Sequence, residues 1–143
     1  MNSYGPVRIG MPVTAVHAEL KALGRKNLPS PANVAKTGCD YYAASESLQF
    51  MIQDGRVVRI ETSEKNVVTP SGIRIGDPIA KVRKVFRDRL SDTQQHYSDD
   101  ALDRTLIVFS SDRKLAMRFE ASAAVTEIYA GNEDSIHYVE GCS

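Results

Sequence analysis

The stretch Val7–Val16 reads VRIGMPVTAV, and sixty-six residues later Ile73–Val82 reads IRIGDPIAKV. The Arg, the Ile before the Gly, the Gly, the Pro and the final Val are identical, and Val/Ile exchanges fill two further positions. Self-similarity at a fixed spacing is typical of repeated supersecondary units. The sequence therefore predicts a tandem repeat, with a first unit at residues 1–69 and a second at residues 70–143.

Each copy of the motif predicts a short strand, a glycine turn and a helix. Pro12 and Pro78 suit the first helical position, where a missing N–H costs nothing because first-turn donors are unpaired. Apolar side chains then recur with the helical period and predict one buried helix face in each unit. These residues are Val13, Val16, Leu20 and Leu23 in the first helix and Ile79, Val82, Phe86 and Leu90 in the second.

Strand signals follow each helix. Residues 48–53 alternate apolar and polar, Asp54-Gly55 is a hairpin dipeptide, and residues 56–62 return as a second strand. The second unit predicts strands at residues 104–110, 114–120 and 124–130 and a closing strand at 136–139. The predicted fold class is α+β: two tandem helix-plus-antiparallel-meander repeats that share one antiparallel sheet, with helices on one face.

The motif resembles that of small bacterial envelope domains, in which apolar-x-apolar-Gly-Met-Thr-x-x-x-Val leads into a helix. The nearest comparisons are the tandem-repeat beta-lactamase inhibitory proteins and the small lipoprotein of the outer-membrane β-barrel assembly machine. Ile9-Gly10-Met11 and Val16 match the first copy, Gly76 is kept in the second, and Pro stands in place of Thr in both. The resemblance implies one sheet with helices on one face and protein binding on the other.

Composition narrows the classes of partner. Lys plus Arg and Asp plus Glu both number 18, so the net charge gives no field that steers the chain toward nucleic acid or an anionic membrane. No apolar run approaches the roughly 20 residues that span a bilayer. We therefore expect no nucleic-acid partner and no membrane span. No signal peptide precedes the first motif, as in a cytosolic protein or a mature secreted chain.

The two cysteines bear on the compartment. Cys39 and Cys142 each follow a glycine, and a bridge between them would tie the end of the chain to its first half. The alternative is two unrelated free thiols in a cytosolic protein. We favour the disulfide, and with it a periplasmic or secreted location.

No motif nominates a catalytic or metal centre. His17, His96 and His137 are far apart in sequence, and no metal-ligand spacing joins them to the cysteines. The acidic run Asp99, Asp100 and Asp103 lacks the glycine and glutamate of a calcium loop. We expect a protein that is not an enzyme and holds no cofactor. A small hydrolase with an unrecognised triad is the least favoured alternative, because triads assemble in space.

Strand alternation predicts what the uncovered face of the sheet carries. Aromatic, Met and Arg residues, which are enriched at protein interfaces, recur at the outward positions. The predicted partner-binding set is Met51, Arg59, Phe109, Arg118, Glu127 and Tyr129. An ordinary mixed surface is the plain alternative, and the loops at residues 25–38 and 91–103 are a competing site.

These observations predict a non-enzymatic periplasmic protein-binding domain whose partner is another protein. One form of this function is an inhibitor-like or immunity protein that blocks a hydrolase. The alternative is a structural or assembly adaptor of the bacterial envelope.

Overall fold

The chain is described by a computed structural model that covers residues 3–143. Its strands are β1 (Ser3–Tyr4), β2 (Val7–Arg8), β3 (Cys39–Ser45), β4 (Leu48–Gln53), β5 (Arg56–Thr62), β6 (Leu90–Gln94), β7 (Asp103–Phe109), β8 (Leu115–Ser122) and β9 (Ala124–Asn132). Its α-helices are α1 (Val13–Ala22), α2 (Ile79–Phe86) and α3 (Glu133–Ile136), and its 3-10 turns are η1 (Pro31–Asn33) and η2 (Arg87–Arg89). Residues 1–2 of the first predicted unit lie outside the described part.

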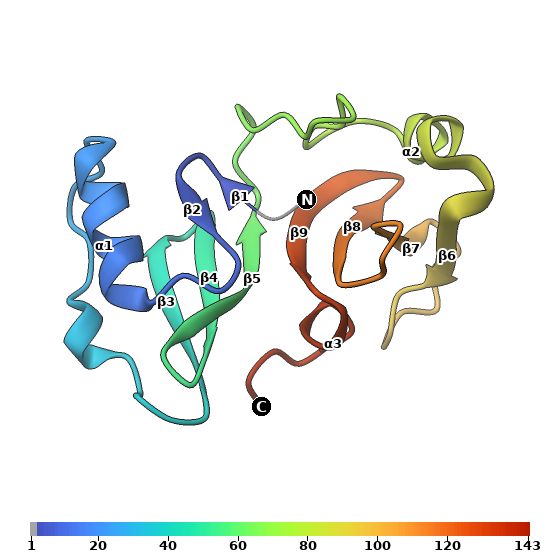
Figure 1. Cartoon of the computed structure of the whole chain (residues 1–143). Coiled ribbons are helices and arrows are strands. Elements are labelled where there is room, and N and C mark those ends of the chain that lie inside the picture. The colour runs from blue at the N-terminus through green and yellow to red at the C-terminus, as the bar shows by residue number, and fades with distance from the viewer. Residues whose placement is uncertain (1–2) are drawn as a thin grey trace.

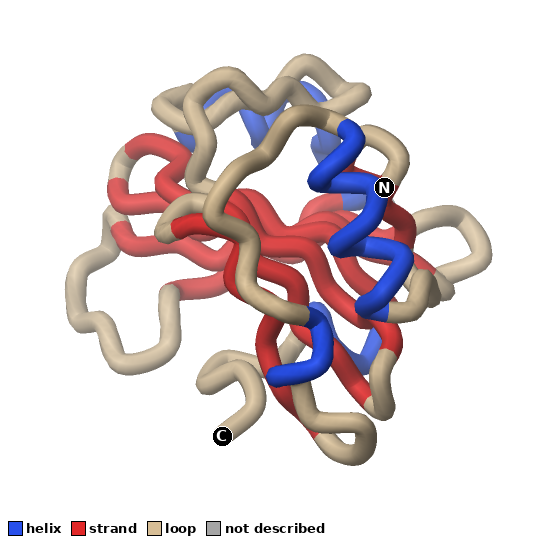
Figure 2. The backbone as a smooth tube through the Cα atoms, turned by 90° about the vertical axis from the view of Figure 1, so that its left-hand side faces the viewer, coloured by secondary structure: helices blue, strands red, loops and turns tan. Residues whose placement is uncertain are grey.

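Seven strands form one antiparallel sheet in the order β3-β4-β5-β9-β8-β7-β6. The first three strands run from the edge strand β3 to β5, and the last four run from the opposite edge strand β6 to β9. The two sets meet where β5 pairs with β9 (Figure 1). Arg59 pairs with Gly131 in this central ladder. Figure 2 shows the strands as one twisted layer behind α1.

The predicted fold class is wrong. The molecule is β-rich, and its α-helices are only 10, 8 and 4 residues long, so tandem helix-plus-meander units are not what builds it. The helices do not share one face either, because α1 and α2 pack on one side of the sheet and α3 contacts the apolar side chains of the other. Residues 136–139, predicted as a closing strand, belong to α3 and the irregular segment after it.

The repeated motif is nevertheless alike in its two copies at the level of the backbone. Gly10 and Gly76 both have φ of 90°, a left-handed conformation in which any side chain would be strained. The Gly10 N–H donates to the carbonyl of Val57 at 2.7 Å, and the Gly76 N–H donates to that of Val125 at 2.8 Å. Pro12 and Pro78 are the N-caps, so each helix begins one residue later than predicted.

The core lies between the sheet and the two longer helices, in two clusters. Val13, Val16 and Leu20 of α1 pack over β3 to β5, where Tyr42 and Phe50 are fully buried. The corresponding residues of α2 pack over β7 to β9, where the rings of Phe86 and Phe119 lie 5.8 Å apart. The apolar faces that the sequence predicts for both helices are confirmed except at their last positions: Leu23 is 55% exposed, and Leu90 is half-buried and begins β6.

Candidate functional site

The side of the sheet opposite α1 and α2, here called the second face, carries two buried Arg–Glu pairs. On β5 the Nε of Arg59 donates to Oε1 of Glu61 at 2.7 Å, and on β8 Arg118 pairs with Glu120 in the same way. Each pair is two residues apart along one strand, which places both side chains on the same face. Because the pairs are buried, each charge needs its partner: a charge removed from water destabilises the fold unless it is paired and hydrogen-bonded.

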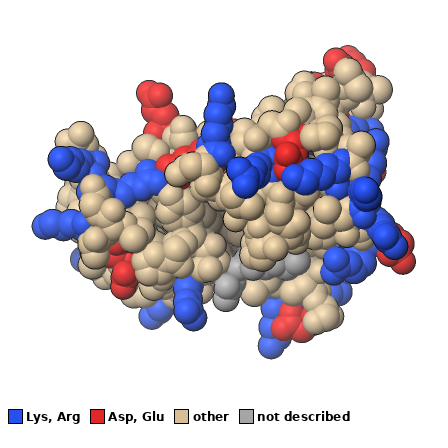
Figure 3. Space-filling model, turned by 90° about the horizontal axis from the view of Figure 1, so that it is seen from above, with Lys and Arg blue, Asp and Glu red and all other residues tan. Residues whose placement is uncertain are grey.

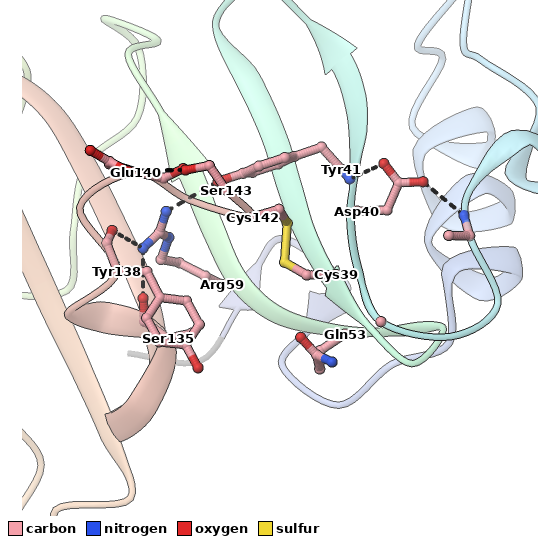
Figure 4. The surroundings of a disulfide bond; sticks show 12 residues. Cys39, Asp40, Tyr41, Gln53, Arg59, Ser135, Tyr138, Glu140, Cys142 and Ser143 are labelled. Atoms are coloured by element: carbon pink, nitrogen blue, oxygen red, sulfur yellow. Dashed lines mark hydrogen bonds between the residues drawn. A yellow bond between two sulfur atoms is a disulfide. The ribbon is translucent and has the colours of Figure 1, made fainter.

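Both arginines also bind the backbone of the C-terminal segment, residues 132–142, here called the C-terminal strap. Nη1 of Arg59 donates to the carbonyls of Ser135 and Tyr138 at 2.6 and 2.9 Å (Figure 4). Nη1 of Arg118 donates to the carbonyls of Ile136 and Tyr138 at 3.0 and 3.4 Å. These carbonyls lie at or after the end of a short helix, where backbone carbonyls lack the partners of a continuing helix. The arginines therefore hold the strap on the second face.

The disulfide holds the far end of the strap. Cys39 on the edge strand β3 is bonded to Cys142, with Cα atoms 5.3 Å apart and a sequence separation of 103. Figure 4 shows the bridge beside Tyr41 and Arg59. The predicted disulfide is thus confirmed, and the strap is fastened by a covalent bond at one end and by arginine contacts along its length.

Two tyrosines of the second face have raised pKa values. Burial, together with the charge of Glu61, raises the pKa of Tyr41 to about 12. Burial and the hydrogen bond to Glu127 raise the pKa of Tyr129 as well. The Tyr129 ring lies between the two guanidinium groups, 5.0 Å from that of Arg59 and 5.2 Å from that of Arg118.

These shifts predict an alkaline limit to stability. A tyrosine whose pKa is higher in the folded than in the unfolded state, where it is about 10, stabilises the fold fully below pH 10. That contribution falls as the pH rises above 10 toward about 12, because the unfolded chain ionises first. Absorbance titration at alkaline pH is expected to show a late-ionising fraction that shrinks in Tyr41→Phe. A titration in which every tyrosine ionises near its ordinary pKa would contradict this.

Beside the strap, the second face is hollowed over β6 to β9. Two adjoining hollows of about 200 and 260 Å³ form one groove between the strap and the loop after β6. Arg118, Thr105 and His96 line both hollows. The smaller hollow is also lined by Ile107 and His137, and the larger by Glu120, Glu127 and Tyr129. Its lining mixes aromatic, aliphatic, cationic and anionic side chains, the mixture found where proteins bind one another.

The structure places the predicted partner-binding residues in two groups. Met51, Arg59 and Arg118 are 0%, 3% and 7% exposed, so Met51 and Arg59 are inaccessible in this conformation and Arg118 is reached only through the groove. Strand alternation does send Arg59 and Arg118 to the second face, but the strap, whose residues 136–139 were predicted as a strand, lies over them. Phe109 and Tyr129 are half-buried and Glu127 is exposed.

Several groove residues were missed by sequence reasoning, among them Thr105 and Ile107 on β7 and His137 in the strap. His96, which also lines the groove, lies in the loop 91–103 that was predicted as a competing site. No local pattern could have selected them, because only the packing of the strap against the sheet brings them together. The competing loops stay predictions: Asp99 and Asp100 are exposed, and Asp103 accepts a hydrogen bond from the Ser98 hydroxyl.

Neither a metal centre nor a membrane helix emerges from residues 3–143. No group of three or more His, Cys, Asp or Glu side chains in this part is arranged to hold a metal ion. None of its helices has the length and apolarity that crossing a bilayer requires.

No protein-family model matches the chain, and no curated protein matches it. A solved structure does: an extracellular protein containing a SCP domain from Bacillus anthracis str. Ames, with a TM-score of 0.51 at 13% sequence identity. The match covers 90% of this chain and 45% of that one, so the chain spans less than half the length of its structural neighbour. At this identity the likeness concerns the fold alone.

Proposed function

We propose that this chain is a non-enzymatic protein-binding domain that works in an oxidising compartment, the periplasm or the cell exterior. The Cys39–Cys142 disulfide supports the compartment, because such bonds persist where thiols are not kept reduced. The likeness to an extracellular protein agrees with it. Binding of another protein is supported by the groove on the second face.

The groove is the observation that carries the proposal. It is an open hollow of mixed chemistry whose floor is formed by the paired strands β7, β8 and β9 of the seven-stranded sheet. Tyr129 can contribute buried area and Glu127, which is exposed at the rim, can accept hydrogen bonds from a partner. Arg118 has its charge neutralised by Glu120, so it can be covered without leaving a lone buried charge.

Two forms of this function differ in what the partner gains. In the first, an inhibitor or immunity protein, the groove and its rim block a hydrolase. In the second, an adaptor of the envelope, the domain holds another protein in place. The adaptor form is favoured by one observation, since the matching fold makes up 45% of a longer extracellular chain and is therefore used as one part of a larger protein there.

Site-directed photo-crosslinking tests the groove. A crosslinking residue at Thr93, an exposed position on its lining, is expected to give a discrete adduct with a protein of the native compartment. Once the partner is identified, Thr93→Tyr combined with Glu127→Lys should weaken binding at least about tenfold, the loss of a modest contact.

Thr14 provides the matched control. It is an exposed threonine on α1, on the other side of the sheet, so neither a crosslinker there nor Thr14→Tyr should affect the adduct or the affinity. Adducts from Thr14 but not from Thr93, or affinity that Thr93→Tyr/Glu127→Lys leaves unchanged, would rule out the groove as the binding site.

A further inference from the structure

The net charge of zero conceals a strong segregation of charge along the chain. Residues 70–90 contain six Lys or Arg and two Asp or Glu, whereas residues 91–143 contain four Lys or Arg and ten Asp or Glu. The first segment forms α2 and η2 on one side of the sheet. Several carboxylates of the second segment, among them Glu120 and Glu127, lie on the second face, away from α2. The part of the surface that α2 and η2 form is therefore basic, and we call it the basic side.

The basic side is built mostly from exposed side chains that carry no counter-charge. We call Arg74, Lys81, Arg83, Lys84, Arg87 and Arg89 the basic face; all are exposed except Lys81, which is half-buried. Lys81 pairs with Asp77 at 2.8 Å and Arg83 with Asp92 at 2.7 Å. Among the ion pairs of residues 3–143, none involves the other four members. Figure 3 shows Lys and Arg side chains gathered on the right, on the side of α2.

The first helix provides an internal comparison. At the positions that correspond to those of Val13, Val16 and Leu20 in α1, α2 has Ile79, Val82 and Phe86, and all six residues are buried. The outward positions differ: Ala15, His17, Ala18 and Lys21 in α1 correspond to Lys81, Arg83, Lys84 and Arg87 in the α2 segment. Lys21 is the one cation among these four positions of α1, and α1 folds on the same sheet, so the charges at the other three are not needed to build the helix.

Arg87 is a second indication, because this charged residue occupies a strained backbone conformation. Its φ is 52°, in the left-handed region that favours glycine. The chain past the end of α1 turns at Gly24, with φ of 84°, and pays no such penalty. An exposed arginine at a strained position is easier to explain by what its side chain contacts outside the molecule than by packing within it.

The shape of the basic face indicates what it contacts. None of its six residues lines a described hollow, so it offers an outward-turned surface and not a pocket for a small anion. The apolar side chain of Val68, 45% exposed, borders it, because Val68 and Arg74 form a β-bridge. Cations spread over a convex surface with an apolar residue at the edge match the headgroup region of an anionic bilayer.

We propose that the basic face docks the domain on an anionic phospholipid bilayer surface. The Lys and Arg side chains contact lipid phosphates, and the chain does not cross the bilayer. Docking in this orientation leaves the second face and its groove turned away from the membrane. The inference does not depend on whether the groove binds a protein.

Vesicle sedimentation with the full, disulfide-bonded chain tests the proposal. Binding is expected to large vesicles of phosphatidylcholine containing about one third phosphatidylglycerol, and not to phosphatidylcholine alone. It should be lost in about 0.5 M NaCl, where charges are screened within a few ångströms. The variant Lys84→Gln/Arg87→Gly/Arg89→Gln should bind about a hundredfold more weakly, at roughly fivefold for each charge removed near the surface.

The control removes the same number of exposed charges from elsewhere. Arg8→Gln/Lys21→Gln/Lys26→Gln should change vesicle binding less than about threefold. These residues lie near α1, at the end of the sheet formed by β3 to β5, and not near α2. Thermal unfolding checks that both variants fold, and Arg87→Gly should not lower the midpoint because it relieves a strained φ. If the first variant still proves unstable, Lys84→Gln/Arg89→Gln keeps the helix and should lose about 25-fold.

Three results would overturn the proposal. One is binding that does not depend on phosphatidylglycerol. Another is an equal loss of vesicle binding in both triple variants, which would mean that the vesicles attract exposed cationic side chains anywhere on the protein. The third is binding to long-chain polyphosphate or DNA with none to the vesicles, which would make the partner a soluble polyanion.

Discussion

Loss of the Cys39–Cys142 disulfide is expected to lower the free energy of unfolding by about 2–5 kcal/mol. The bridge closes a loop of 103 residues, and on the chain-entropy model a loop near that length restricts the unfolded chain by about 4.7 kcal/mol. The native state loses contacts too, because the strap is no longer fastened at its end. Urea unfolding of Cys39→Ser/Cys142→Ser, compared with the oxidised chain, measures the difference.

The reductant provides the control for this prediction. Dithiothreitol should lower the urea midpoint of the natural sequence toward that of the Cys39→Ser/Cys142→Ser variant and should leave the variant itself unchanged. Equal midpoints for the oxidised chain and the variant would show that the bridge contributes little and that the arginine contacts alone keep the strap in place.

Replacing Arg59 by methionine is expected to cost about 3–5 kcal/mol, the loss measured when one partner of a buried ion pair is removed. Arg59 is 3% exposed and Glu61 7%, so the substitution leaves a carboxylate buried opposite an apolar side chain. It also removes the guanidinium donor from the carbonyls of Ser135 and Tyr138. Chemical denaturation measures the loss, and faster proteolysis within residues 132–142 would report release of the strap.

A second substitution separates the buried charge from the lost side chain. Arg59→Met/Glu61→Met removes both charges and should recover much of the loss, since buried pairs replaced by apolar residues are often close to neutral in stability. The matched control is Arg113→Met, which breaks an exposed pair with Glu133 and should cost under about 1 kcal/mol. A cost at Arg59 no greater than that at Arg113 would show that Glu61 is adequately solvated without its partner.

Both predictions concern the strap, and they bear on function through it. Arg59 can reach a partner only if the strap leaves the second face, whereas Arg118, Glu127 and Tyr129 line the groove with the strap in place. Crosslinking at Thr93 in the oxidised chain and in the Cys39→Ser/Cys142→Ser variant would therefore show whether a partner binds beside the strap or in its place.

Local features were predictable from the sequence because local physics decides them. The repeated Ile-Gly-x-Pro fixes a left-handed glycine and a helix start in both copies, whatever surrounds them. Alternation assigned Arg59, Arg118 and Tyr129 to the second face, because the side-chain period of a strand is two residues. With two cysteines in the chain, Cys39 and Cys142 form the single possible pair, so the sequence could name the partners, although the fold brings their Cα atoms to 5.3 Å.

Tertiary structure decided what covers what. Residues 136–139 were predicted as a strand from their own sequence, but the segment lies where its carbonyls contact Arg59 and Arg118, which come from strands far away in the chain. The same contacts bury residues that alternation alone leaves on an open face and form one wall of the groove. A net charge of zero likewise does not reveal the basic face. Charges interact over distances in space, and only the fold separates α2 from the carboxylates of the second face.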